Sequence, residues 1–268
     1  MHLTALDDAA WSSPWRRRPV ADKALLSLGL VLTALLAPPA PGGLLVIVVA
    51  LAALLGPARV PPRLLVEALG PPVAFVVLGA LSVAVAVGAA TPDAWWALGP
   101  LSMGPESAAR GAGLVVHGVA GALGVLVLAT TTPMVDLVTA ARRLRIPAAC
   151  LDIAALVYRL LFVLLDVALA AHAAQAARLG GSGRVADRLR AAGSLVGTVL
   201  VHSFARARRL TEGLAGRGYE DDLRTLPVTG PRSLRFEAVA LAAITAVWLV
   251  VWVSAVGPFL GASPGQGA

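Results

Sequence analysis

Long apolar runs, separated by short polar or proline-rich stretches, constrain this chain more than any other feature of its sequence. A helix that crosses the hydrocarbon core of a bilayer needs about 20 apolar residues. Five runs meet or approach that length, and they lie at about 22–38, 42–57, 71–90, 108–132 and 234–257. Because 58% of the 268 residues are hydrophobic and only 14% are charged, the chain would be hard to keep in water. The sequence therefore predicts an all-α integral membrane protein with about five transmembrane helices.

The first two runs are short, close to the lower limit of about 17 residues for a membrane-crossing helix. The stretch "PPAPGG" at 38–43 lies between them. Proline and glycine in series interrupt a helix, so a tight helical hairpin is favoured over one long span.

The basic residues predict how the spans are oriented. They precede the first span, follow the second, begin the fourth or lie in the later part of the chain: Arg16, Arg17, Arg18, Lys23, Arg59, Arg63, Arg110 and fifteen between Arg142 and Arg235. If the N-terminus is cytoplasmic, all of the 22 Lys and Arg residues except Arg110 fall on or beside the cytoplasmic side, as the positive-inside rule requires. Topology thus accounts for the net charge of +7. With few aromatic residues to stack on bases, no nucleic-acid partner is expected.

This orientation divides the chain into four segments. We expect a cytoplasmic N-terminal segment at 1–21 and four transmembrane helices within 22–132. A cytoplasmic region at 133–232 follows, and the last transmembrane helix with an external tail occupies 233–268.

The region 133–232 is predicted to contain one short helix and two long ones, at about 133–144, 147–178 and 184–217. At 1.5 Å per residue, each long helix extends roughly 45–50 Å. The first long helix is apolar nearly all round, apart from Asp152, Arg159 and Asp166, which are seven residues apart and share a face. We expect Arg159 to pair with Asp152 or Asp166. The two long helices are predicted to pack together near the cytoplasmic interface.

No motif for catalysis or for a bound cofactor is present in the sequence. The only lysine, Lys23, follows Asp22, so the chain has no phosphate-binding P-loop, and no nucleophile or zinc-protease motif appears. The single Cys150 excludes an internal disulfide and a thiolate metal cluster. We therefore predict no enzymatic activity, no cofactor and no metal site.

The four histidines are scattered along the chain. His117 in the fourth span is either a functional residue, as intramembrane histidines often are, or a hydrogen-bond partner between helices. His172 and His202 fit polar packing contacts on the long helices. His2 could touch a metal or lie in a disordered N-terminus.

The stretch "LTEGLAGRGYEDD" at 210–222 ends the second long helix with Arg217 between Gly216 and Gly218. One interpretation is an ordinary helix end, with a cation near the negative end of the dipole and a glycine at C′. The other is a contact point for a partner, because Arg178 stands at the matching end of the first long helix.

With these elements in place, the chain resembles the transmembrane T component of energy-coupling factor (ECF) transporters, and in particular the cobalt branch, CbiQ. The N-terminal "LDDAAWSSPWRRRPVADKALL" is similar to the entry of that branch. The stretches "RIPAACLDIAALVYRLLFVLLDVALAAHAAQAAR" and "SFARARRLTEGLAGRGY" resemble its two coupling helices. The resemblance covers nearly the whole chain.

The resemblance implies a scaffold that couples ATP hydrolysis to uptake and binds no substrate alone. Its expected partners are two cytoplasmic ATPase subunits, a substrate-binding S component similar to CbiM and a small accessory membrane subunit similar to CbiN, in a prokaryotic cell membrane. Short Ala-Arg-Gly motifs of the family dock on the ATPases. Here they correspond to Ala177-Arg178 and to Gly216-Arg217-Gly218, although Leu179 replaces a small residue in the first.

The substrate implied by the branch is cobalt, with nickel or a vitamin as alternatives. A self-sufficient membrane permease is an alternative of a different class, and it predicts uptake without ATPase partners. An intramembrane enzyme is disfavoured because no nucleophile–base pair or metal constellation can be assembled from the sequence.

Overall fold

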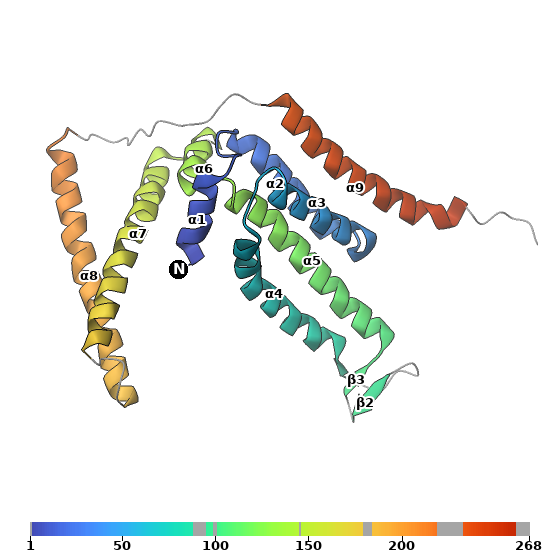
Figure 1. Cartoon of the computed structure of the whole chain (residues 1–268), viewed down its shortest axis with the longest axis horizontal. Coiled ribbons are helices and arrows are strands. Elements are labelled where there is room, and N and C mark those ends of the chain that lie inside the picture. The colour runs from blue at the N-terminus through green and yellow to red at the C-terminus, as the bar shows by residue number, and fades with distance from the viewer. Residues whose placement is uncertain are drawn as a thin grey trace, which may run out of the picture. The chain divides into compact units, whose positions relative to one another are not determined.

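The computed structural model of the chain describes residues 2–87, 95–98, 101–144, 146–178, 184–218 and 233–260. The chain forms two compact units (Figure 1). We call Met1–Asp136 with Val228–Ala268 the bundle unit, and Leu137–Pro227 the hairpin unit.

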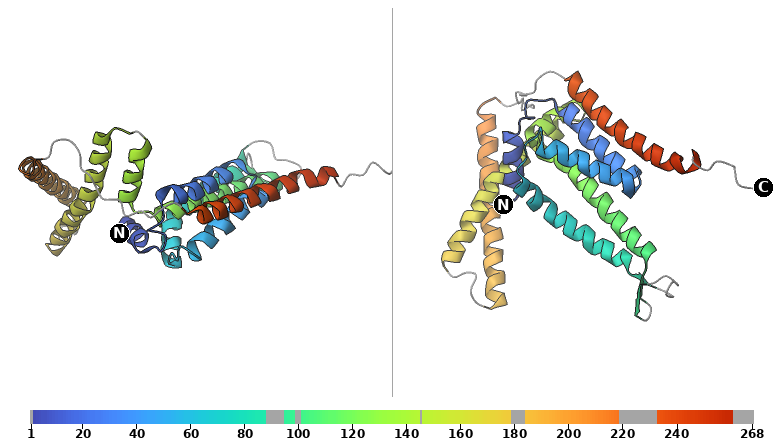
Figure 2. Two further views of the ribbon diagram at one scale, coloured as in Figure 1. Left: turned by 90° about the horizontal axis from the view of Figure 1, so that it is seen from above. Right: turned by 45° about the vertical axis from the view of Figure 1, so that its right-hand side comes forward.

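The bundle unit is built around one central helix. Its helices are α1 (His2–Ser12), α2 (Val20–Leu36), α3 (Leu44–Leu55), α4 (Pro62–Ala84), α5 (Pro105–Ala129) and α9 (Leu234–Leu260). Helices α2, α3 and α4 pack on α5, and α9 packs on α2 (Figures 1 and 2). A short turn at Pro39–Gly43 joins α2 to α3, as the proline- and glycine-rich stretch predicts. Three short strands, β1 (Ala86–Val87), β2 (Trp96–Leu98) and β3 (Leu101–Met103), pair antiparallel in the order β1-β3-β2 between α4 and α5.

Small residues on α5 allow its neighbours to approach closely. A Cβ atom on Gly118 would lie 2.7 Å from a methyl carbon of Val76 in α4, and one on Gly124 would lie 2.8 Å from a methyl carbon of Val31 in α2. Both distances are shorter than Cβ contacts in proteins, so a larger residue at either position would displace its neighbour. Small residues at helix interfaces are typical of membrane bundles, where the hydrophobic effect does not drive helices together.

Four helical segments are long and apolar enough to cross a membrane: Pro62–Ala84, Pro105–Ala129, Ala149–Ala177 and Leu234–Ala255. Three of them overlap predicted spans, but α4 begins at Pro62 rather than at about residue 71, and it ends at Ala84 rather than at about residue 90. The first two predicted spans lie on α2, which has 17 residues, and on the shorter apolar segment Pro39–Leu55. The segment Ala149–Ala177 has the length and composition of a span, although the sequence predicts it within the region 133–232 near the cytoplasmic interface. The prediction of an all-α membrane protein is confirmed.

The hairpin unit consists mainly of two long antiparallel helices, α7 (Ala148–Ala177) and α8 (Val185–Ala215). The amide of Gln175, near the end of α7, donates to the carbonyl of Ala191, near the start of α8. Farther along, Leu164 of α7 and Phe204 of α8 line one small cavity. Figures 1 and 2 show the two helices side by side and running in opposite directions. A short helix, α6 (Met134–Ala141), and a 3-10 turn at Arg142–Leu144 precede the two long helices. The packing of α7 on α8 confirms the prediction that the two long helices pack together.

Candidate functional site

The predicted contact residues stand at the C-terminal ends of α7 and α8. Arg178 is the residue that follows α7, and its backbone N–H donates to Gln175 at 3.1 Å. At the end of α8, the N–H groups of Arg217 and Gly218 donate to Leu214 and Ala215 at 3.0 and 3.2 Å. Gly218 has a φ of +70°. A left-handed residue at this position is what the sequence predicted, and it needs glycine because other side chains are strained there.

Both helix ends are open to a partner. Ala177, Arg178 and the residues from Gly216 to Gly218 are exposed. A Cβ atom added at Gly218 would have no neighbour within 4 Å. Within the described part of the chain, neither Arg178 nor Arg217 takes part in a salt bridge. The acids expected to follow, Glu220 to Asp222, lie outside the described residues.

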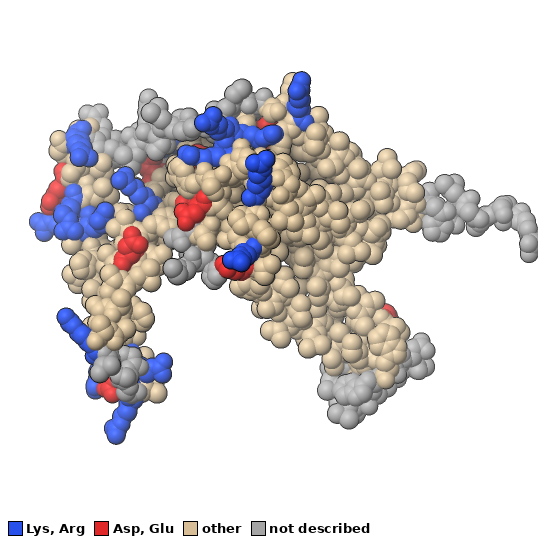
Figure 3. Space-filling model, viewed as in Figure 1, with Lys and Arg blue, Asp and Glu red and all other residues tan. Residues whose placement is uncertain are grey.

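The antiparallel packing sets the two arginines at opposite ends of the hairpin. Arg178 lies beside the start of α8, whereas Arg217 lies at its far end. Because α8 has 31 residues, the two are roughly one helix length, about 45 Å, apart. Figure 3 shows Lys and Arg gathered towards the two ends of the α7–α8 hairpin, with mostly uncharged surface between them. A single pocket on one partner cannot accept both arginines, but two partner subunits can.

The charged residues on α7 are arranged differently from the prediction. Asp152 pairs with Arg142 at 2.5 Å, and its side chain is only 5% exposed. Arg159 and Asp166 are exposed, and no salt bridge among the described residues joins Arg159 to either acid. Seven residues separate Arg159 from each acid, a rise of about 10 Å along the helix. The 3-10 turn instead brings Arg142 back over the first turn of α7, where it fastens the corner between α6 and α7.

The histidines form no metal site in the described residues, which hold no cluster of three or more His, Cys, Asp or Glu able to bind an ion. The two ring nitrogens of His117 lie 2.9 Å from the carbonyl of Gly113 and 3.2 Å from that of Ala37. The second contact joins α5 to the end of α2, so the interpretation as a helix–helix hydrogen bond is confirmed. His172 and His202 are exposed. α1 begins at His2, whose side chain lies outside the described positions.

A buried polar cluster that sequence reasoning missed holds the start of α2 in the bundle unit. Lys23 and Asp22 are both fully buried. The Lys23 ammonium donates to the carbonyl of Thr131 at 2.9 Å, beyond the end of α5, and the Asp22 carboxylate accepts from the N–H of Ser233, before α9. The sequence signal was an Asp-Lys pair at the start of an apolar helix, together with the run Thr130 to Thr132 at the end of another.

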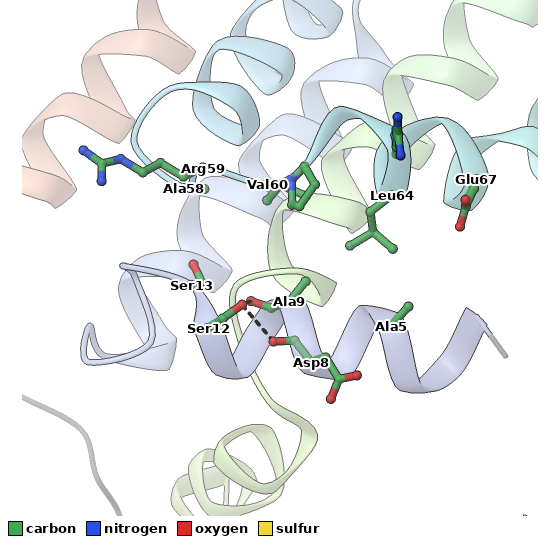
Figure 4. Close-up of a pocket in the computed structure, with 12 residues that line it drawn as sticks. Ala5, Asp8, Ala9, Ser12, Ser13, Ala58, Arg59, Val60, Leu64 and Glu67 are labelled. Carbon is green, nitrogen blue, oxygen red and sulfur yellow. Dashed lines mark hydrogen bonds between the residues drawn. The ribbon is translucent and has the colours of Figure 1, made fainter.

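A recess of about 450 Å³ separates α1 from the α3–α4 connection and the start of α4 (Figure 4). Arg59, in that connection, has a φ of +53°. In Figure 4 the Asp8 side chain of α1 and the Glu67 side chain of α4 do not point towards one another, and Arg59 points away from both. The side chains of Asp8, Arg59 and Glu67 therefore do not converge on one point in the recess. Its wall includes α1, a helix that sequence reasoning did not predict.

Comparisons with known proteins agree on one family. The chain matches the family CbiQ, described as "Cobalt transport protein", over residues 12–226. It is 36% identical over 254 residues to "Cobalt transport protein CbiQ" of Rhodobacter capsulatus, covering 94% of this chain and 100% of that protein. It is 27% identical over 218 residues to "Putative fused cobalt transport protein CbiMQ" of Methanocorpusculum labreanum, covering 80% of this chain and 36% of that protein. "Uncharacterized protein MJ1089" of Methanocaldococcus jannaschii is 28% identical over 141 residues, 52% of each chain.

Proposed function

The chain belongs to the CbiQ family of cobalt transport proteins, and we propose that it is the energy-coupling T component of an ECF-type transporter for cobalt. In this role it links cytoplasmic ATPases to a membrane subunit that captures the substrate. The alternatives of nickel or a vitamin as substrate differ only in the partner that captures it.

One observation carries the proposal: two exposed arginines end two long antiparallel helices at opposite ends of the hairpin unit. A guanidinium group binds a carboxylate through two parallel hydrogen bonds, which an ammonium group cannot reproduce. We propose that Arg217, with Gly216 and Gly218, inserts into an acidic groove of one ATPase subunit. Arg178, with Ala177, does the same in a second subunit, more weakly because Leu179 is bulkier than the family's small residue.

The length and packing of the helices suit mechanical coupling. An α-helix of 30 residues is stiff, so a displacement applied at one end moves the whole element. Because Arg178 ends α7 and Arg217 ends α8, two ATPase subunits that approach or separate displace α7 relative to α8. The long helices then pass that movement to the transmembrane helices, and the chain itself hydrolyses no ATP, in keeping with the absence of a P-loop motif from the sequence.

The partners follow from the same role. The fused relative, whose name joins CbiM and CbiQ, supports a CbiM-like S component beside this chain, and a CbiN-like accessory subunit completes the proposed complex. We place the N-terminus and region 133–232 on the cytoplasmic side of a prokaryotic cell membrane, as the distribution of Lys and Arg favours. Because no described cluster of ligands could hold a metal, the isolated chain is expected to bind no Co²⁺ tightly.

Charge reversal tests the proposal. The chain is co-expressed with its ATPase and S component, purified in mild detergent, and assayed for co-purifying ATPase and for ATP-dependent Co²⁺ uptake. Arg217→Glu leaves a desolvated like-charge contact and is expected to cost about 2–5 kcal/mol of binding free energy. Arg178→Glu adds to the loss. The matched control is Arg159→Glu, an exposed arginine on α7 about 28 Å from Arg178 along the helix.

The control should assemble and transport as the unchanged chain does. If Arg217→Glu and the double variant also assemble and transport fully, the docking role is wrong and Arg217 is an ordinary helix end. Uptake by this chain without any ATPase would instead establish the permease alternative.

A further inference from the structure

A cavity of about 540 Å³ lies in the bundle unit between α3 and α9, beside α2. Its long walls are apolar. They are formed by Leu26 of α2, Val49 and Ala53 of α3, and Phe236, Val239 and Ala243 of α9. No part of the proposed coupling function uses this space.

One end of the cavity is positively charged. Arg18 lies just before α2, and Arg235 lies in the first turn of α9; both line the cavity. Among the described lining residues there is no acid, and within the described chain neither arginine forms a salt bridge. The cavity therefore has two cationic side chains at one end, and the rest of its wall, along α3 and α9, is apolar.

The Arg18 side chain is held in place by aromatic rings. Its guanidinium carbon lies 4.6 Å from the centre of the Phe236 ring and 5.8 Å from that of Trp15. The two rings pack edge to face with centres 4.9 Å apart, and Trp15 is only 4% exposed. Stacking on a ring leaves the in-plane N–H groups of a guanidinium available to an anion. These ring contacts thus hold the Arg18 guanidinium in position at the charged end of the cavity before an anion binds.

We propose that this cavity binds an anionic phospholipid, with its phosphate between Arg18 and Arg235 and an acyl chain along α9 towards Ala243. Basic pockets between transmembrane helices are typical sites for acidic headgroups. The two arginines flank the first residues of two apolar helices, the level at which headgroups lie. From Arg235 to Ala243, α9 rises about 12 Å, a length that a free phosphate would leave empty and an acyl chain fills.

Native mass spectrometry of the purified full-length chain tests this. The chain, in a neutral detergent, is offered phosphatidylglycerol or phosphatidylcholine with identical acyl chains. We expect stronger binding of phosphatidylglycerol. In the double variant R18Q/R235Q that binding should fall roughly thirtyfold, from the loss of two cations. The control R59Q/R63Q removes two arginines of the same unit that lie outside the cavity, and its lipid binding should be unchanged.

A second variant separates a lipid site from a simple anion site. Ala243→Phe fills the apolar part of the cavity and keeps both arginines, so it should weaken phosphatidylglycerol binding while R59Q/R63Q does not. Several results overturn the proposal: equal binding of the two lipids, unchanged binding in R18Q/R235Q or in Ala243→Phe, or full displacement by millimolar inorganic phosphate. It is also overturned if the assembled transporter carries no phosphatidylglycerol and the variant Ala243→Cys crosslinks to a partner membrane subunit, since the cavity is then a protein interface.

Discussion

Helix α5 of the bundle unit packs against α2, α3 and α4 and contributes buried residues to the core, whereas α8 of the hairpin unit packs on α7 and none of its residues is buried. In the bundle, Leu30, Val46 and Leu123 are at most 1% exposed. In the hairpin, apolar side chains such as Val196 and Phe204 of α8 are 67% and 69% exposed. Apolar side chains exposed to this degree along a 31-residue helix are expected to be covered by lipid or by a protein partner.

The difference assigns separate tasks to the two units. The bundle buries a core of its own, so changes within that core act on the stability of the isolated chain. The hairpin leaves most of the α8 surface and both helix ends exposed, so changes there act on assembly. This division can be tested in mild detergent, where the temperature of unfolding and local hydrogen exchange measure stability and co-purification measures assembly.

The largest effect is expected at the buried cluster of the bundle. Lys23→Met removes the ammonium that donates to Thr131 and that attracts the carboxylates of Asp22 and Asp136. Leaving one partner of a buried ionic group unpaired costs about 3–5 kcal/mol of the free energy of unfolding. Lower yield and a lower unfolding temperature should result.

The double variant Asp22→Asn with Lys23→Met is the control for this cluster. Because it removes both charges, it should regain part of the lost stability. A double variant as unstable as the sum of its two single variants would show that the two buried charges do not interact.

A smaller effect is expected from overpacking α5. A Cβ added at Gly118 would lie 2.7 Å from Val76, and Gly118→Val adds two further methyl groups, whereas a Cβ added at Gly121 would have nothing within 4 Å. The first change should cost about 1–3 kcal/mol of the free energy of unfolding. Gly121→Val is the matched control on the same helix and should leave the unfolding temperature nearly unchanged. Equal effects at the two glycines would mean that α4 and α5 do not approach as closely as described.

The apolar runs of the sequence predicted most helices because a membrane helix needs a length and a composition that can be counted along the chain. The end of α8 was predicted in detail, since a glycine after Arg217 is a local signal for a left-handed residue.

What sequence reasoning could not supply depends on tertiary contacts. The sequence predicts only a cytoplasmic charge at Lys23, because its burial depends on contact with Thr131, 108 residues away. The partner of Asp152 was missed because Arg142 reaches it only through the turn after α6. The separation of Arg178 from Arg217 required the antiparallel packing of α7 and α8.

At the corner between α6 and α7, we expect an effect confined to the hairpin unit. Asp152→Asn removes the charge that Arg142 contacts at 2.5 Å. Losing a charged hydrogen bond to a nearly buried carboxylate costs about 1.5–3 kcal/mol. This loss lowers the free energy of local opening at the start of α7 and leaves the bundle core untouched. We expect faster hydrogen exchange at the start of α7, with little change in the unfolding of the bundle unit. Asp166→Asn, an exposed acid on the same helix, is the control. If the bundle unfolds at a lower temperature in Asp152→Asn, the two units are not independent in stability.

The smallest effect on the isolated chain is expected on the exposed surface of α8. Val201 is 69% exposed, so Val201→Ser removes little packing and should change the free energy of unfolding by less than about 0.5 kcal/mol. Its counterpart in the bundle is Val46→Ser, which places a hydroxyl at a fully buried position and should cost about 1–3 kcal/mol. Co-purification with the partner subunits then separates an effect on assembly from an effect on stability. If the surface of α8 is covered in the transporter, Val201→Ser should reduce the amount of co-purifying partner although the isolated chain is as stable as before. A Val201→Ser chain that is destabilised alone, yet assembles normally, would mean that α8 is already packed within the chain.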